Sequence, residues 1–132
     1  MPRIIIISII VLFSFAKSFG QNQEPIIIGQ KYFIESKILN ESREYWVYLP
    51  SDYNKSKYDY PVMYLLDGQE HFHQITGVVN HLSRLVPRMP GMIVVGIVST
   101  DNDRVRDYTP NKIEILPNGG GADIFTRFLK KE

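Results

Sequence analysis

The stretch "YPVMYLLDGQEHFHQ", residues 60–74, is an unbroken apolar run that ends abruptly at an acid, a glycine, a second acid and two histidines. A short continuous apolar run bounded by turn residues is typical of a strand covered on both faces, as in a parallel sheet. Pro61 stands at the first position of the run, where its missing N–H does least harm. The sequence therefore predicts a buried strand over 61–67 that ends in a glycine turn.

The residues before this strand predict a β-hairpin. Two strand-like segments lie between residues 30 and 50, around the turn-forming cluster Asn40-Glu41-Ser42. In the second segment large apolar residues fall on both faces, with Tyr45, Val47 and Leu49 alternating with Trp46 and Tyr48. We therefore expect a strand that carries large apolar groups on both faces and ends at Pro50.

The residues after the glycine turn predict a helix, a strand, a loop and a second helix. Apolar residues at helical spacing favour a helix of about three turns that closes at Pro87 and Pro90; they are Ile75, Val78, Val79, Leu82, Leu85 and Val86. Residues 91–98 predict a second buried strand, 99–118 a long polar loop, and 122–132 a helix whose apolar face consists of Ile124, Phe125, Phe128 and Leu129. This order indicates an α/β sheet with crossover connections.

The last predicted helix has no terminating residue. Its periodic pattern continues to Glu132 without a Gly, Asn or Pro, and no strand follows it. We interpret the chain as a fragment of a longer protein. The alternative is a genuine C-terminal helix that frays into solvent.

The first twenty residues have the pattern of a secretory signal peptide. Arg3 precedes an apolar stretch of 13 residues, from Ile4 to Ala16, whereas crossing a bilayer takes about 20. We expect residues 1–20 to be removed before Gln21, so that residues 21–132 form a single domain exported to the periplasm or the extracellular space without stable membrane insertion. A retained N-terminal anchor is the alternative.

Composition excludes several classes of function. Without Arg3 and Lys17 the chain has 13 basic and 14 acidic residues, so its net charge is near −1, and a nucleic-acid partner is not expected. Because the chain has no Cys, it has neither disulfides nor a thiol nucleophile. No motif indicates a cofactor.

Five motifs in order resemble the putative esterase family of α/β-hydrolases, whose relatives include esterase D and the enterochelin-type siderophore esterases. They are "R-x-Y-W-V-Y-L-P", "Y-P-V-M-Y-L-L-D-G", "I-V-V-G-I", "T-D-N-D-R-V-R-D-Y-T-P" and "G-G-A-D-I-F", and they span about residues 30–132. The resemblance implies the N-terminal portion of an α/β-hydrolase fold with an incomplete sheet. It also implies a serine carboxylic-ester hydrolase that acts on a small-molecule ester through an acyl-enzyme.

The family's nucleophile motif is not found in these residues. In "GIVST", residues 96–100, Val98 stands where a nucleophile would be, and we expect no helix directly after this strand. By the resemblance, the serine, acid and histidine all come later, so the chain alone is expected to be inactive. The alternative is a non-catalytic secreted binding or interaction module with an esterase-like fold.

The resemblance places half of an oxyanion hole in the "DGQE" corner. Gly68 would allow the tight turn, and the backbone amide of Gln69, with that of Glu70 second, would meet the oxyanion. We expect Asp67 to orient the loop or cap the following helix rather than act as a catalytic acid. Asp67, His71 and Arg106 are candidate substrate-binding residues.

Two further expectations concern metals and association. His71, His73 and His81 lack the ligand set of a metal site, and the acidic loop 100–110 lacks the glycine and glutamate of a calcium loop, so no metal is predicted. Arg106 and Asp107 are expected to hold that loop by ion pairing. If strand order follows the family, residues 61–67 lie at an uncovered sheet edge through which the fragment self-associates.

Overall fold

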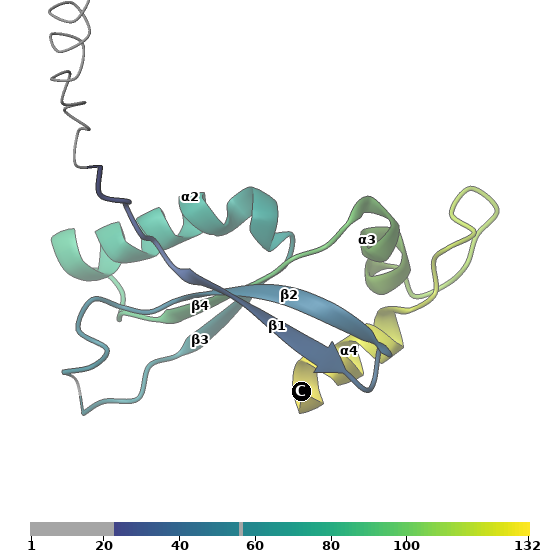
Figure 1. The fold of residues 1–132 in the computed structure, drawn as a ribbon, viewed down its shortest axis with the longest axis horizontal. Helices are drawn as coiled ribbons and strands as arrows, with labels where there is room; N and C mark the ends of the chain where they lie inside the picture. Colours follow the sequence, from purple (N-terminus) through teal and green to yellow (C-terminus); the bar gives the residue numbers. More distant parts are fainter. Residues whose placement is uncertain (1–22, 56) are drawn as a thin grey trace, which may run out of the picture.

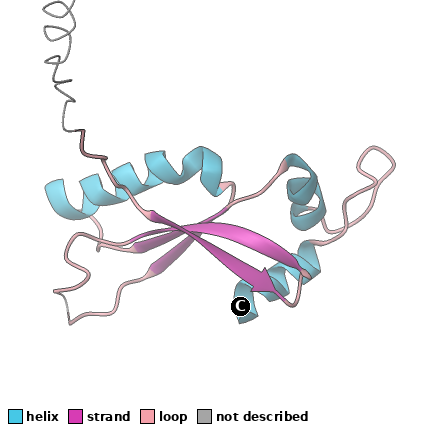
Figure 2. Cartoon of the chain, viewed as in Figure 1, coloured by secondary structure: helices cyan, strands magenta, loops and turns pink. Residues whose placement is uncertain are grey.

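The computed structural model describes residues 23–55 and 57–132, which form one sheet with helices on both faces (Figures 1 and 2). The signal peptide predicted over 1–20 lies outside these residues. The elements, in chain order, are β1 (Gln30–Ser36), β2 (Glu41–Tyr48), β3 (Val62–Leu65), α2 (Gly68–Asn80), the π-helical turn η1 (His81–Leu85), β4 (Ile93–Ile97), α3 (Asp101–Tyr108) and α4 (Ala122–Lys131).

The sheet has the strand order β1-β2-β4-β3. The β1–β2 and β2–β4 pairs are antiparallel, whereas β3 and β4 are parallel and are connected by α2 and η1. Helix α2 covers one face of the sheet and α4 lies on the other (Figure 1). This mixed sheet confirms the predicted α/β class. No helix in the described part of the chain has the length and apolar character to cross a membrane.

Alternating side chains of the central strands supply two separate cores. On the α2 face Phe72 and Val79 pack against Val94 and the partly buried rings of Trp46 and Tyr48. On the other face a second cluster forms where α4 meets the sheet; its members include Ile97, Phe125, Phe128, Tyr45 and Val95. The large apolar residues of the second strand contribute to both clusters, because a strand places successive side chains on opposite faces.

The hairpin turn lies earlier than predicted. It occupies residues 37–40, and Glu41 already pairs with Ser36 at the start of β2. The left-handed residue is Asn40, with φ 56°, a conformation that Asn adopts at low cost. The side chain of Ser36 closes the turn by accepting a hydrogen bond from the amide of Leu39 at 2.9 Å.

Helix α2 begins earlier than predicted and buries a different face. Its buried residues are Gly68, Phe72, Thr76 and Val79. Of the residues expected on the buried face, three are exposed: Val78 by 47%, Leu85 by 66% and Val86 by 40%. The predicted helical spacing was right, and Val79 of the predicted apolar face is buried. The face that α2 turns toward the sheet is displaced from the predicted one, however, so the sheet covers only part of the apolar residues.

The prediction of a loop over 99–118 was wrong for its first half, where the chain forms helix α3. Thr100 caps this helix by accepting the amide hydrogen of Asp103 at 3.3 Å. The sequence "DNDRVRDY" has almost no apolar residue, and a helix without an apolar stripe leaves no periodic signal. Ion pairs to β2, described below, stabilise α3 instead.

Strand β3 is not covered on both faces as predicted, and it lies at the edge of the sheet. Val62 is 48% exposed and Tyr64 58% exposed. Tyr64 lines a hollow of about 200 Å³ together with Phe128 and Leu129 of α4. The expected uncovered edge is therefore present, while self-association through it stays a prediction.

Candidate functional site

The candidate site lies where the carboxyl ends of the parallel strands β3 and β4 meet. Crevices at the carboxyl ends of such strands are the usual binding sites of open α/β sheets. The turn after β3, Asp67 to Gln69, leads into α2, and the turn after β4, Val98 to Thr100, leads into α3. The sequence-predicted corner and the loop "TDNDRVRDYTP" are thus side by side in the fold.

Gly68 does not make the tight turn as the sequence suggested. The turn is made by Asp67, which is left-handed with φ 53°, and not by Gly68. A Cβ on Gly68 would instead lie 2.7 Å from the carbonyl carbon of Gly96. The glycine is therefore needed because the first turn of α2 presses against the backbone of β4, and this contact sets the position of the following amides.

The amides of Gln69 and Glu70 differ in availability. The amide of Glu70 donates to the carbonyl of Asp67 at 3.0 Å. Within the described residues no acceptor is found for the amide of Gln69, as expected for the first turn of a helix. Of the two oxyanion-hole candidates, Gln69 is accordingly the one with a free donor. No bound ligand tests this role, which remains a prediction.

The side chain of Gln69 is bonded to the backbone after β4. Its Nε2 donates to the carbonyl of Ser99 at 2.8 Å, and the amide of Ser99 donates to its Oε1 at 3.1 Å. Ser99 is buried. The oxygen and the nitrogen of one carboxamide therefore satisfy both backbone groups of a buried residue. The sequence analysis missed this interaction because the two residues are 30 positions apart.

Tyr108 of α3 completes this arrangement. Its hydroxyl lies 2.8 Å from Oγ of Ser99 and accepts a longer hydrogen bond, 3.4 Å, from the amide of Asp67. Burial raises the pKa of the Tyr108 hydroxyl above its ordinary value, so the group stays protonated at neutral pH. The two turns and α3 are in this way joined by side chains.

The carboxylate of Asp67 does not cap α2, so the capping alternative was wrong. Its Oδ2 pairs with Nε of Arg104 at 3.0 Å, while its Oδ1 is buried without a hydrogen-bond partner among the described residues. This contact between the β3 turn and α3 agrees with the loop-orienting role. Binding of substrate by Asp67 stays a prediction.

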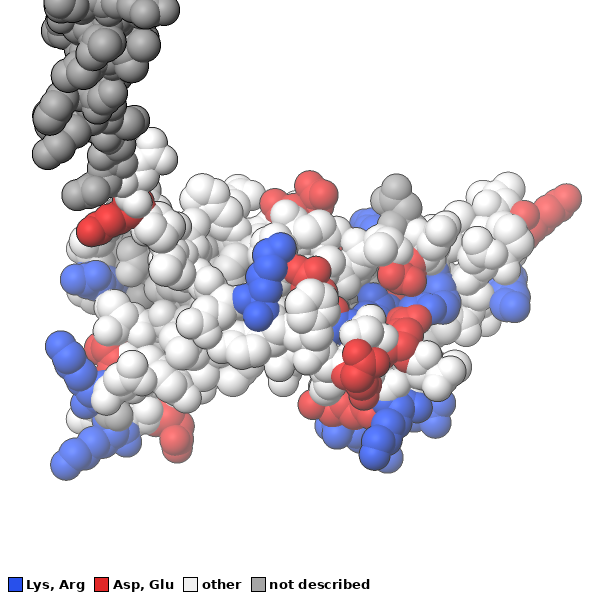
Figure 3. Space-filling model, viewed as in Figure 1, with Lys and Arg blue, Asp and Glu red and all other residues white. Residues whose placement is uncertain are grey.

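Behind α3 a group of ion pairs connects it to the start of β2. Arg43, which is 3% exposed, forms a short ion pair with Asp107, which is 2% exposed. Arg106 pairs with Asp107 and Glu41, each at 2.7 Å. Charges of both signs therefore gather where the hairpin turn, α3 and α4 meet (Figure 3). The expected pairing of Arg106 with Asp107 is confirmed, and substrate binding by Arg106 is untested.

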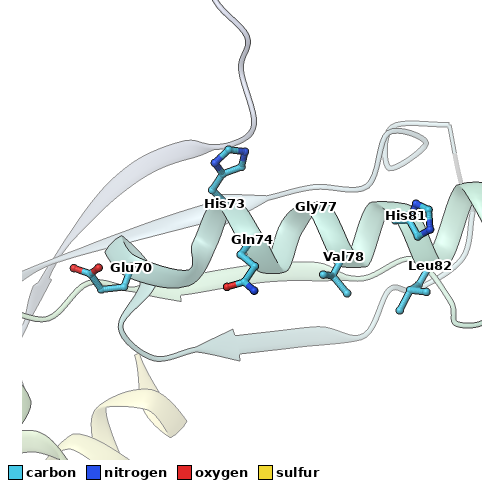
Figure 4. A pocket seen from close by; sticks show the side chains of 7 residues that line it. All are labelled: Glu70, His73, Gln74, Gly77, Val78, His81 and Leu82. Atoms are coloured by element: carbon cyan, nitrogen blue, oxygen red, sulfur yellow. The ribbon is translucent and has the colours of Figure 1, made fainter.

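The three histidines do not converge. His71 and His73 lie on α2, where a separation of two residues is a rotation of about 200° around the helix axis, so the two side chains point to nearly opposite sides. His73 and His81 line a shallow hollow of about 570 Å³ that runs along the outer side of α2 and η1 and reaches Glu70 at the start of α2 (Figure 4). Among the described residues no three His, Cys, Asp or Glu side chains are grouped to hold a metal. Substrate binding by His71 is untested.

The expectation that no helix follows the "GIVST" strand was wrong, because α3 follows it directly. The strand, turn and helix needed for a nucleophile elbow are thus present here in outline. However, position 98 is a valine, and the neighbouring Ser99 is buried with its hydroxyl against Tyr108 rather than an imidazole. Among the described residues, this corner combines the free amide of Gln69 with a buried serine whose hydroxyl contacts Tyr108.

Comparisons with known proteins give one consistent result. Residues 36–132 match the family model described as Putative esterase. An IroE-like serine hydrolase from Shewanella oneidensis is similar with a TM-score of 0.73 and 38% identity, over 79% of this chain and 36% of that protein. The BES protein from Bacillus cereus gives 0.70 and 25%, over 83% and 46% of the two chains.

The enterobactin esterase from Shigella flexneri shares the fold, with a TM-score of 0.62 and 21% identity over 83% of this chain and 26% of that one. The chain thus spans less than half the length of each of these three solved structures. No curated protein sequence matches it.

Proposed function

The chain belongs to the putative esterase family, and from this premise we propose that it forms the N-terminal part of a serine carboxylic-ester hydrolase. The observation that carries the proposal is the free amide of Gln69 at the carboxyl ends of β3 and β4. The 38% identity with a serine hydrolase supports it. The substrate class is a small-molecule carboxylic ester.

In the proposed reaction the complete protein supplies the serine, acid and histidine from residues beyond this chain. The serine oxygen attacks the ester carbonyl carbon, its proton passes to the histidine, and the carbonyl electron pair moves onto the oxygen. The amide of Gln69 donates to this oxyanion, a contact typically worth about 3 kcal/mol of transition-state stabilisation. The intermediate expels the alcohol, which takes the proton back, and water then releases the acid.

The proposal includes export. The basic Arg3 and the apolar stretch that ends at Ala16 are those of a secretory signal peptide, so the enzyme would act in the periplasm or outside the cell. Mass spectrometry of the exported protein tests this part, since a mature chain that still begins with Met1 contradicts cleavage before Gln21.

Hydrolysis of p-nitrophenyl acetate tests the activity. The complete protein is expected to turn this ester over above a buffer blank, and a fluorophosphonate probe is expected to label one serine outside residues 1–132. The 132-residue chain by itself is expected to be inactive and unlabelled. Labelling of Ser99, or turnover by the isolated chain, contradicts the proposed division of the site. A complete protein without turnover and without labelling supports a non-catalytic binding module instead.

A further inference from the structure

We propose that the side chain of Gln69 is a positioning residue that aims its own backbone amide at the oxyanion. This inference rests on the proposed ester hydrolysis and adds a residue role to it. The amide lies in the first turn of α2, where its N–H has no acceptor within the helix. Its direction therefore depends on what ties this turn to the rest of the protein.

The tie is the pair of hydrogen bonds between the Gln69 carboxamide and the backbone of Ser99. A primary amide offers a donor and an acceptor side by side, as a peptide group does. Here Nε2 to the Ser99 carbonyl is 2.8 Å and the Ser99 amide to Oε1 is 3.1 Å. The side chain thus joins the start of α2, which follows β3, to the backbone just after β4.

Two neighbouring contacts keep this connection rigid. Gly68, directly before Gln69, is packed against Gly96 so closely that a Cβ would lie 2.7 Å from backbone. On the other side the Tyr108 hydroxyl holds Oγ of Ser99 at 2.8 Å. With Gly68 packed against Gly96 and the Ser99 backbone held beside Tyr108, the Gln69 side chain is the connection that holds its own peptide group in place relative to Ser99.

The experiment uses Gln69→Asn in the complete protein, because Asn keeps the carboxamide but is one methylene too short to reach Ser99. Deleting one oxyanion donor typically lowers kcat by about 100- to 1000-fold, and misdirecting a donor that is still present should lower it by roughly 10- to 100-fold. KM for p-nitrophenyl acetate should change less than about twofold, since the donor acts in the transition state. The exposed Gln74 on the same helix gives the matched control Gln74→Asn, which should leave kcat unchanged.

A transition-state analogue separates positioning from a loss of folded enzyme. A trifluoromethyl ketone forms a tetrahedral oxyanion adduct with the serine, so its inhibition constant should rise in Gln69→Asn by the same factor by which kcat/KM falls. Active-site titration with a fluorophosphonate corrects for inactive protein. A kcat within twofold of the parent, or a fall in kcat with unchanged inhibition by the ketone, overturns the proposal.

A second variant, Gln69→Glu, gives a readout that a merely structural role would not produce. When the introduced carboxyl is ionised, it has no hydrogen to donate to the Ser99 carbonyl. When it is protonated, its O–H can donate to that carbonyl again. The ratio of its kcat to that of the parent should therefore increase as the pH falls through the pKa of the introduced carboxyl. A flat ratio contradicts the inference. If the parent protein does not hydrolyse esters at all, the proposed function itself fails, which is a distinct outcome.

Discussion

Replacing Asp107 with Asn tests whether its buried ion pair with Arg43 holds α3 in place. The two side chains are 1% and 4% exposed, and Arg43 also lies over the ring of Phe125, 5.6 Å from its centroid. The substitution keeps the volume but removes one charge of a buried pair, which typically costs about 3–5 kcal/mol. Because Oε1 of Glu41 stays 2.7 Å from Nε of Arg43, we expect the lower end, about 3 kcal/mol of unfolding free energy.

Urea denaturation of the complete protein, followed by circular dichroism, measures this loss. The matched control is Asp103→Asn on the same helix, since Asp103 is 28% exposed and lies 3.8 Å from Arg43. Its loss should remain below about 1 kcal/mol, as for exposed pairs. Equal, small losses for both variants would show that the Arg43–Asp107 pair is effectively solvated and would refute the reasoning.

Three other expectations concern packing, titration and association. Gly68→Ala should cost about 1–3 kcal/mol, because its Cβ would lie 2.7 Å from the backbone of β4, whereas Gly77→Ala, with open space around its Cβ, should stabilise the same helix by about 0.5–1 kcal/mol; similar effects in urea melts contradict the close contact. The hydrogen bond from Trp46 lowers the pKa of Glu44 below its ordinary 4.5, so Glu44 stabilises the fold above that value and loses this contribution as the pH falls through the lowered pKa. Trp46→Phe should therefore raise the NMR titration midpoint of Glu44, and an unchanged midpoint contradicts the assigned cause. Tyr64→Lys on the exposed edge should reduce self-association of residues 21–132 in size-exclusion chromatography, and a monomeric parent chain would exclude association through this edge.

Local sequence patterns predicted most elements but not all of them. Continuous apolar runs identified β3 and β4, and the spacing of Phe125 and Phe128 identified α4. Helix α3 was missed because its sequence is nearly all polar and charged, and what stabilises it is the pairing of Asp107 with Arg43, 64 residues earlier. An ion pair between distant positions leaves no periodic pattern along the chain.

The buried face of α2 is a second feature that local sequence patterns did not predict. The apolar stripe indicated a helix, but Val78 and Leu85 are exposed. The contact between Gly68 and the backbone of Gly96 sets how the helix sits on β4, and neither glycine reveals its partner in the sequence.

The amino-acid sequence by itself determined the α/β class, the order of most elements, the family and the turn that holds the Gln69 amide. These properties depend on residues close together in the chain, or on motifs that can be read in order. The tertiary structure alone decided that Asp67 rather than Gly68 makes the left-handed turn, and that the Gln69 side chain binds the backbone of Ser99. The physical reason is that hydrogen bonding and close packing act between groups that folding brings together, whereas periodicity records only which side of each element is apolar.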